Sequence, residues 1–420
     1  MGETPVYVLG VGATPVGRHE KCSFTDLVRE AYLNTLDDAG SPDSESIEGV
    51  WFASTLMDFW EQRALRGQAV LGPLMEEGSM PVGLRIVNVD GGCASGSVAF
   101  NGAWSAVRQG ADLALAIGVE KMNDADRPGG ELLRWIEGTG NMLDPGWFWR
   151  PYHAAAEQLG VSFSPGDGRS AAMDVYAILA LTHMRRYGTT VRQIAHAAAK
   201  NHCNAVGNPR AQYRFPMTVD EVLEDRLVVP PLTRAMCAPR GDAGGAILVC
   251  SERYLARQPA DVRERALLVR GHDVAGGRLH ATWENDRAPV RALSTTYRMA
   301  DLGPGDLDIV ELHDASSFAE IHLIEDIGLC ARGDGGPFTA SGATARDGRT
   351  PVNPSGGLVS RGHPIAATGI LMLHELALQL RGEAGEIQVD GARIGLVENG
   401  GGILDLDAAV CSTTILQRVS

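Results

Sequence analysis

The stretch VNVDGGCASGS, residues 87–97, joins an apolar run to the start of a helical pattern through two glycines and a cysteine. The overlapping segment RIVNVD predicts a strand, and SVAFNGAWSAVRQG predicts a helix that is apolar nearly all round. Cys93 would then lie at the mouth of a helix, where free N–H groups and the helix dipole stabilise a thiolate. This position favours a nucleophile held as an anion. The alternative is a small residue packed beneath a tight helix start.

Outside this stretch, apolar strands alternate with helices along most of the chain. Strand patterns occur in VYVLGVG, GVWFAS and ADLALAIGV, and later in DIVELHD and ARIGLVENGGGI. SFTDLVREAYLNTLDDAG, with Ser23 and Asp26 at its start, and ILMLHELALQLRG predict helices. Fully apolar strands that alternate with helices indicate an α/β fold whose sheet is covered on both faces.

The pattern restarts near residue 267, where ALLVRGHDVAGG echoes YVLGVGATPVG near the beginning. We therefore expect two related α/β halves, one at residues 1–122 plus about 240–260 and the other at residues 261–420. Residues 123–239 differ in pattern, and we interpret them as an inserted loop domain. The length of 420 residues fits several units, because a single hydrophobic core stops growing at roughly 250–300 residues.

Charge and cysteine content exclude several classes of protein. The net charge of −15 repels phosphate backbones, so we expect no nucleic-acid partner. The seven cysteines contain no CxxC pair, which argues against a disulfide framework or a zinc site and favours a reducing compartment. His374 and Glu375 interrupt the longest apolar helical candidate, so no membrane span is expected. Together with the lack of a signal-peptide pattern, this predicts a soluble cytoplasmic protein.

Two histidines are candidate partners for a nucleophilic thiol. His313 follows the apolar run DIVEL, and His363 lies in the glycine-rich segment NPSGGLVSRGHP before a predicted helix. A thiol nucleophile needs a base and an oxyanion site, and each of these histidines stands at the end of an element where such groups gather. Either histidine alone is more often structural. Together with the glycine loop ENGGGI, residues 398–403, they form a set.

A dinucleotide site is the competing interpretation of the glycines near the beginning. Gly10, Gly12 and Gly17 follow a strand, but Pro15 stands where the third glycine of that motif belongs. No acidic ribose ligand follows at the usual spacing either. A tight turn from strand to helix explains these glycines.

Several motifs together resemble the thiolase superfamily, and most closely the sterol-carrier-protein-type thiolases. In chain order they are NVDGGCASGS, LAIGVEKM, PRGDAGGAILVCSE, ELHDASSFAEIHLIEDIGLC and NPSGGLVSRGHPIAATG. The resemblance implies a five-layered αβαβα core of two related halves with an inserted loop domain, usually in a homodimer.

The resemblance also implies a role for each site residue. Cys93 would be the acyl-accepting nucleophile, and His363 the base that deprotonates it. His313 and His363 would hold the thioester oxygen of the second acyl unit. The N–H groups of Cys93 and Gly400 would form the other oxyanion hole, around the acyl-enzyme carbonyl.

These roles imply a thiolase-type acyl-CoA C-acyltransferase. It would cleave a 3-ketoacyl-CoA with coenzyme A, or catalyse the reverse Claisen condensation, through an acyl-Cys93 intermediate. Coenzyme A would be a substrate, and we expect no bound cofactor and no metal.

The sequence departs from the family at both cysteines that shuttle a proton. Ala315 occupies the cysteine position of the HDCF motif, and Glu398 stands at the cysteine position of the CxGxG loop. Glu398 could transfer the proton if burial raises its pKa toward neutrality. Alternatively it binds a polar substrate group or orients His363, which would suit retro-aldol cleavage of a 3-hydroxyacyl-CoA. A third alternative is a non-catalytic acyl-CoA-binding subunit, and a small zinc-ribbon and OB-fold partner, known in this subgroup, is an expectation to test.

Other residues carry weaker expectations. The aromatic segment GWFWRPYH, residues 146–153, is interpreted as domain core or as the lining of an acyl or coenzyme A channel. Phosphate contacts are expected from some of the basic residues Lys200, Arg234 and Arg240. Asp314 is expected to orient nearby backbone, Glu325 and Asp326 to face solvent, and Cys330 and Cys411 to be core residues.

Overall fold

The computed structural model describes residues 4–124, 144–164, 170–279 and 287–419. Within them a nine-stranded sheet has the order β3-β2-β4-β7-β1-β8-β11-β10-β9. Its strands are β1 (Val6–Ala13), β2 (Val50–Ala53), β3 (Ile86–Val89), β4 (Leu113–Glu120), β7 (Ala243–Ser251), β8 (Leu267–Gly276), β9 (Ile309–Leu312), β10 (Ile394–Gly401) and β11 (Val410–Arg418). The strands expected from the apolar runs are therefore present.

The sheet consists of two halves with the same pairing scheme. In the first half β1 pairs antiparallel with β7, β7 pairs antiparallel with β4, and β4 pairs parallel with β2. In the second half β8, β11, β10 and β9 repeat this scheme in the same order. The halves meet where β1 and β8 pair over two residues, with Tyr7 opposite Leu268. The internal echo in the sequence thus marks the two central strands.

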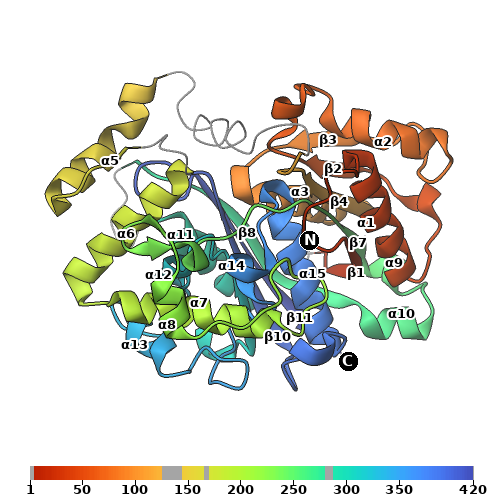
Figure 1. Cartoon of the computed structure of the whole chain (residues 1–420). Helices are drawn as coiled ribbons and strands as arrows, with labels where there is room; N and C mark the ends of the chain where they lie inside the picture. The colour runs from red at the N-terminus through yellow and green to blue at the C-terminus, as the bar shows by residue number, and fades with distance from the viewer. Residues whose placement is uncertain (1–3, 125–143, 165–169, 280–286, 420) are drawn as a thin grey trace.

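Helices cover the outer faces of the halves and fill the space between them (Figure 1). The outer helices α1 (Phe24–Asp38) and α11 (Ala288–Ala300) pack on β1 and β7 and on β8 and β11. The inner helices α3 (Ser95–Arg108) and α15 (Thr368–Arg381) contact each other and strands of both halves. This arrangement is the expected five-layered αβαβα core.

The local signals in the sequence explain these elements. Helix α1 begins after Ser23, whose hydroxyl accepts from the Asp26 N–H while the Asp26 carboxylate accepts from the Ser23 N–H. This capping box is the one that the sequence predicts. The helix buries one apolar face, including Tyr32, against the sheet. Helix α15 is buried along nearly its whole length because it lies in the central layer.

The region between the halves is largely helical. Its elements are α5 (Pro145–Leu159), α6 (Ala171–Tyr187), α7 (Val191–Ala205), α8 (Val219–Glu224), β5 (Leu227–Val229) and β6 (Leu232–Thr233). They share a hydrophobic cluster that includes the buried Trp149 and Tyr152, so these aromatic residues are core. The segment 125–143, which belongs to the predicted insertion, lies outside the described residues.

The remaining helices connect the strands. They are α2 (Arg66–Glu76), α9 (Glu252–Leu255), α10 (Ala260–Arg265), α12 (Ser317–Ile327), α13 (Gly335–Ala340) and α14 (Gly357–Arg361). None of the helices in the described ranges combines the length and the apolar character that a membrane crossing requires.

Candidate active site

Cys93 lies in a short 3-10 turn, Gly92–Ala94, between β3 and helix α3. Gly92 has a φ of +57°, and a Cβ at this position would stand 2.8 Å from the backbone nitrogen of Gly402. Only glycine allows the two loops to approach this closely. The approach brings the Gly402 N–H to the Cys93 sulfur, where it acts to lower the thiol pKa. Cys93 as a whole residue is half-buried, and its side chain packs against an apolar cluster.

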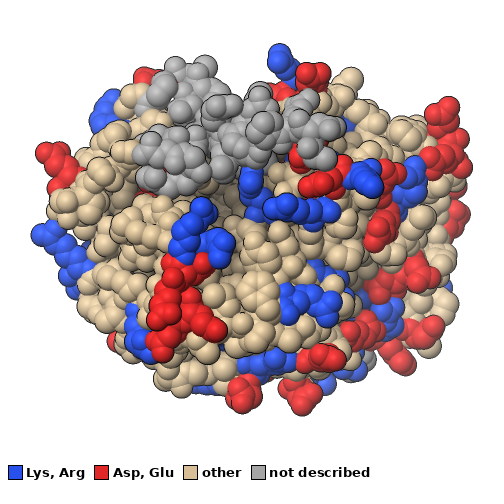
Figure 2. All heavy atoms as spheres, viewed as in Figure 1, with Lys and Arg blue, Asp and Glu red and all other residues tan. Residues whose placement is uncertain are grey.

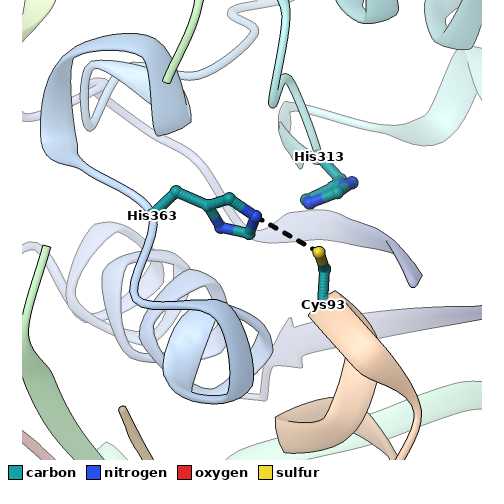
Figure 3. Close-up of side chains that lie close together, drawn as sticks. All are labelled: Cys93, His313 and His363. Atoms are coloured by element: carbon teal, nitrogen blue, oxygen red, sulfur yellow. Dashed lines mark hydrogen bonds between the residues drawn. The ribbon is translucent and has the colours of Figure 1, made fainter. Parts of the chain in front are cut away.

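His363 faces the thiol from the loop before α15 (Figure 3). Its Nε2 lies 3.3 Å from the Cys93 sulfur, and its Nδ1 lies 2.7 Å from the hydroxyl oxygen of Thr368. The Thr368 hydroxyl donates to the Pro364 carbonyl at 3.1 Å, so it accepts from Nδ1. We therefore assign the proton of the neutral ring to Nδ1. Nε2 is then free to accept the proton of Cys93.

His313 is the third member of the cluster. Its ring centroid lies 5.1 Å from that of His363, and it follows strand β9 directly. The side chain is 5 % exposed, and its Nε2 has no hydrogen-bond partner among the described residues. A buried ring nitrogen of this kind can bind an oxygen of a ligand. The cluster thus combines a thiol, a base and an unpaired imidazole.

The same three side chains could also hold a metal ion. The ligand atoms of Cys93, His313 and His363 all lie within 4.8 Å of one another. Sulfur and imidazole nitrogen suit a thiophilic ion such as Zn²⁺. The 3.3 Å contact between the Cys93 thiol and His363 accounts for the cluster without an ion, so we do not assign these residues as metal ligands.

Burial keeps the thiol and the imidazoles neutral. It raises the pKa of Cys93 to about 12, against the lowering effect of the Gly402 N–H. Burial also lowers the pKa of His313 to about 3 and that of His363 well below its usual value of 6.5. The expectation of a thiol held as an anion is therefore wrong for this state. The pair rests as S–H and neutral ring, because removing water penalises both charged forms.

Glu398 lies deeper, in strand β10, and is 1 % exposed. One carboxyl oxygen accepts from the backbone N–H of His313 at 3.2 Å, and the other lies 3.1 Å from the sulfur of Cys411. Burial raises the pKa of Glu398 to about 7, while these two hydrogen bonds oppose the rise. The side chain can therefore gain and lose a proton near neutral pH, as the sequence hypothesis requires.

The two halves meet at this site through their inner helices. A Cβ at Gly369, in the first turn of α15, would lie 2.1 Å from the Ser97 hydroxyl in α3 and 2.4 Å from the Asn399 side chain in β10. Glycine is required at this close contact. Ser97 in turn donates to Asn399 at 2.8 Å. These contacts fix the loop that carries Cys93 against the loops that carry His363 and Glu398.

Glu120 is a second buried carboxyl near the cluster, at the end of β4. It accepts hydrogen bonds from Ser54, Thr55 and Leu56, which follow strand β2, and from the Ala366 N–H, which follows the His363 loop. The carboxyl thus ties a loop of the first half to the second half.

Apolar and aromatic side chains surround the thiol. Cys93 and Trp60 pack against a cluster formed by Leu56, Phe59, Met122 and Ile365. On the other side Tyr176 of helix α6 packs against three hydrophobic clusters. Burial raises the pKa of the Tyr176 hydroxyl, and nearby Cys93 and Glu398 add to the rise. The helical insertion therefore contributes directly to the surroundings of the site.

The structure corrects some of the predicted neighbours of Cys93. Gly402, rather than the predicted Gly400, approaches the Cys93 turn. A Cβ at Gly400 would instead lie 3.6 Å from a Glu398 oxygen and 3.7 Å from His313 Nδ1. Gly400 therefore lies beside Glu398 and His313.

The structure also shows the surroundings of three residues that were not expected to take part in catalysis. Asp314 accepts from the Leu358 N–H at 2.6 Å and orients that backbone, as predicted. Glu325 and Asp326 do not face solvent: their side chains are fully buried and pair with His183, Arg287 and Arg332. These two side chains are buried because helix α12, which carries them, is covered by helices α6, α7 and α11.

Sequence reasoning missed Thr368, Glu120 and Cys411. Thr368 and Glu120 belong to the quoted motifs NPSGGLVSRGHPIAATG and LAIGVEKM, which gave them no role. A polar residue five positions after a candidate base is a usable signal for Thr368. Cys411 was correctly expected to be buried, but its partner Glu398 is reached only across two strands.

Family models agree with this architecture. The model "Thiolase, N-terminal domain" matches residues 6–229, and the model "Thiolase C-terminal domain-like" matches residues 281–418. The chain belongs to the thiolase family. An acetyl-CoA acetyltransferase of Methanothermobacter thermautotrophicus is 35 % identical over 94 % of the chain and 96 % of the relative.

Other relatives of this thiolase family member carry different names. Sterol carrier protein 2 of Bos taurus is 31 % identical over 94 % of the chain and 69 % of the relative. The benzoylsuccinyl-CoA thiolase subunit BbsB of Thauera aromatica is 30 % identical and covers 92 % of each chain. Among solved structures, the Ltp2-ChsH2(DUF35) aldolase has a TM-score of 0.77 at 20 % identity, over 99 % of this chain and 98 % of that one. Human mitochondrial 3-ketoacyl-CoA thiolase has a TM-score of 0.68 at 16 % identity, over 99 % of each.

Proposed function

We propose that the protein is a thiolase-type acyl-CoA C-acyltransferase that works through an acyl-Cys93 intermediate. The observation that carries this proposal is the 3.3 Å contact between the Cys93 sulfur and Nε2 of His363, whose other nitrogen is held by Thr368. A thiol next to an oriented base is the arrangement that covalent acyl transfer needs. In the degradative direction the substrates are a 3-ketoacyl-CoA and coenzyme A.

The first half of the reaction breaks a carbon–carbon bond. His363 Nε2 takes the Cys93 proton as the sulfur attacks the 3-keto carbon, and the N–H groups of Gly402 and Cys93 stabilise the resulting oxyanion. The bond between C2 and C3 then breaks, and its electron pair moves onto the thioester oxygen beside His313 Nε2. Protonated Glu398 gives its proton to C2. The shortened acyl-CoA leaves, and the acyl group remains on Cys93.

The second half returns every proton. The thiol of coenzyme A attacks the acyl-Cys93 carbonyl and gives its proton to the Glu398 carboxylate. The Cys93 sulfur leaves and takes back the proton that His363 holds. Because both halves pass through a thioester, the same groups can run the Claisen condensation in reverse.

Coenzyme A carries phosphates, and Arg240 is our candidate for binding them. Its backbone pairs with that of His363. Burial lowers the pKa of its guanidinium, and the charge of nearby Arg18 lowers it further. The other two basic residues that the sequence singles out form ion pairs, Lys200 with Glu320 at 3.0 Å and Arg234 with Asp225 at 2.8 Å. Lys and Arg side chains gather near the middle of the face in Figure 2, although the chain is acidic overall.

Mass spectrometry tests the proposal. The protein is incubated with a panel of 3-ketoacyl-CoA esters and coenzyme A, and its intact mass is recorded beside that of C93A. We expect the wild type to gain the mass of one acyl group, and C93A to gain none and to lose at least about a thousandfold in thiolysis. Substrate cleavage that survives in C93A would overturn the proposal.

A retro-aldolase is the second candidate, and it is favoured by the two missing cysteines. Ala315 and Glu398 stand where the family carries its proton-shuttling thiols. A retro-aldolase would cleave a 3-hydroxyacyl-CoA without coenzyme A and without an adduct on Cys93. The C93A variant therefore separates the two reactions, since an aldolase would keep its activity.

We further propose that the protein forms a homodimer and works with a small acyl-CoA-binding subunit. The edge strand β3 leaves backbone groups unpaired, and its Val87 is 36 % exposed, which suits pairing with a second copy. The benzoylsuccinyl-CoA thiolase relative is itself named as a subunit. Copurification from the native host followed by mass measurement of the complex tests both assemblies.

A further inference from the structure

Cys411 is the one cysteine besides Cys93 whose thiol, among the described residues, contacts a side chain of the site. It lies in β11, where it pairs with Gly400 of β10, while Glu398 pairs with Thr413. Cys411 and Glu398 are thus diagonal neighbours on one face of the sheet, within reach of a long side chain. The Cys411 sulfur lies 3.1 Å from one Glu398 oxygen, and both side chains are almost fully buried.

The carboxyl group of Glu398 is held from two sides. The backbone N–H of His313 donates to one oxygen at 3.2 Å, and the Cys411 S–H donates to the other. The oxygen that Cys411 holds is also the one nearest to Gly400, where a Cβ would stand 3.6 Å from it and 3.7 Å from His313 Nδ1. Cys411 therefore fixes the oxygen that lies beside Gly400, near the His313 ring.

We propose that Cys411 is a positioning residue for proton transfer at C2 of the acyl-CoA. Its S–H holds the Glu398 carboxylate with one oxygen toward the substrate and stabilises the ionised form of that carboxylate. This assignment rests on the proposed acyltransferase function. A cysteine from β11 would thus support the proton transfer for which this chain lacks the two cysteines of the family motifs.

The directions of the pKa shifts of Cys411 and Glu398 agree with these two roles. Burial and the charge of Glu398 raise the pKa of Cys411 well above 9, so Cys411 keeps its proton. The hydrogen bond from Cys411 lowers the pKa of Glu398, against the effect of burial. Glu398 is therefore the group that exchanges a proton with substrate, and Cys411 sets how readily it ionises.

The test measures hydrogen–deuterium exchange at C2 of an acyl-CoA in wild type, C411A and C411S. The probe is the straight-chain acyl-CoA ester that the wild type exchanges fastest, beginning with acetyl-CoA. Exchange needs the carboxylate form of Glu398, so its rate rises with pH through the pKa of that group. We expect C411A to move the midpoint up by about one pH unit and to slow exchange about tenfold below it. C411S keeps a donor and should restore both values.

C250S is the matched control. Cys250 is a buried cysteine in β7, the strand that corresponds to β11 in the other half, and it packs in an apolar cluster. C250S should leave the pH midpoint unchanged. A purely structural role for Cys411 would lower the unfolding temperature of C411A without moving the midpoint, and that result would overturn the proposal.

Two further measurements separate this proposal from the proposed function. Exchange of labelled coenzyme A into the acyl-CoA needs Cys93, His363 and a proton moved between coenzyme A and Glu398, but no proton transfer at C2. If the wild type shows neither exchange, the acyltransferase function fails. Infrared titration of the Glu398 carboxyl, identified by its loss in E398Q, still decides on Cys411: an upward shift in C411A that C411S reverses supports the proposal, and an unchanged midpoint contradicts it.

Discussion

Each half of the molecule buries one glutamate near the carboxyl end of corresponding strands, Glu120 in β4 and Glu398 in β10. Burial raises the pKa of both to about 7. Glu120 accepts four hydrogen bonds, two on each oxygen, from the groups described above. Among the described residues Glu398 accepts one on each oxygen, from Cys411 and from His313.

The number of donors, rather than the pKa, therefore separates the two carboxyl groups. A carboxylate has about four lone-pair positions, and Glu120 fills all of them with fixed donors. No lone pair of Glu120 is left to accept a proton from a substrate, so Glu120 serves to hold the two halves together. Glu398 keeps a free position on each oxygen and lies beside His313. Buried carboxyl groups of similar pKa can thus have a structural role in one half and a chemical role in the other.

The largest expected effect comes from neutralising each glutamate in turn. We expect E398Q to lower the carbon–carbon bond step on the order of a hundredfold or more, because its amide cannot exchange a proton with C2. E120Q should instead destabilise the fold by about 1–3 kcal/mol, because its NH₂ group faces backbone N–H donors. Steady-state thiolysis rates and urea unfolding of both variants check the pair. Equal loss of rate in E120Q and E398Q, at equal stability, would remove the distinction.

Two steps at C2 should depend on pH in opposite ways. Proton removal from C2, measured as C2 exchange, needs the Glu398 carboxylate, so its rate should rise as pH increases through about 7. Carbon–carbon cleavage gives a proton to C2 and needs protonated Glu398, so its single-turnover rate should fall over the same range. On the limb where the required form is the minor one, each rate should change about tenfold per pH unit. Rates of C2 exchange and of single-turnover cleavage from about pH 5 to pH 9, compared in wild type and E120Q, measure this. If E120Q shifts the pH midpoint as strongly as C411A does, the titration does not belong to Glu398 alone.

A smaller effect is expected at Arg361, which lies two positions before His363. It is 1 % exposed, and its three guanidinium nitrogens have no hydrogen-bond partner among the described residues. Its charge helps to lower the pKa of His313 and His363. R361M removes the charge, so the pKa of His363 should rise and Cys93 acylation should slow severalfold at about pH 6. R361K keeps the charge and should keep the wild-type profile. If the acylation rates of R361M and R361K fall in the same way toward acid pH, this charge does not act on His363.

The smallest expected effect comes from removing one donor to Glu120. S54A deletes the hydroxyl that lies 3.1 Å from the Glu120 carboxyl, and the side chain is buried. We expect a loss of about 1 kcal/mol in the free energy of unfolding and no change in the pH midpoint of C2 exchange. Urea unfolding measures this loss. The control is S341A, which removes an exposed hydroxyl that donates to the Phe338 carbonyl. A shifted midpoint in S54A would mean that the two carboxyl groups are coupled.

Much of the fold and part of the site could be predicted from sequence because the signals are local. The capping box of Ser23 and Asp26, and the apolar strands that end near Cys93 and His313, depend on residues only a few positions apart. The thiolate expectation was wrong because the helix-mouth pattern carries no information about desolvation. The burial of Cys93 by the Gly402 loop and the neighbouring apolar cluster involves segments that are distant in the chain.

The sequence by itself determined the strands, the helices and the family, because side-chain periodicity and motif spacing are properties of neighbouring residues. Only the tertiary structure decided which buried groups share a proton. Cys411 reaches Glu398 through the register of β11 on β10, and Cys93 reaches His363 through the contact between α3 and α15. Register and helix packing are collective results of the whole core, and a shift of one residue in β11 would turn Cys411 to the opposite face of the sheet.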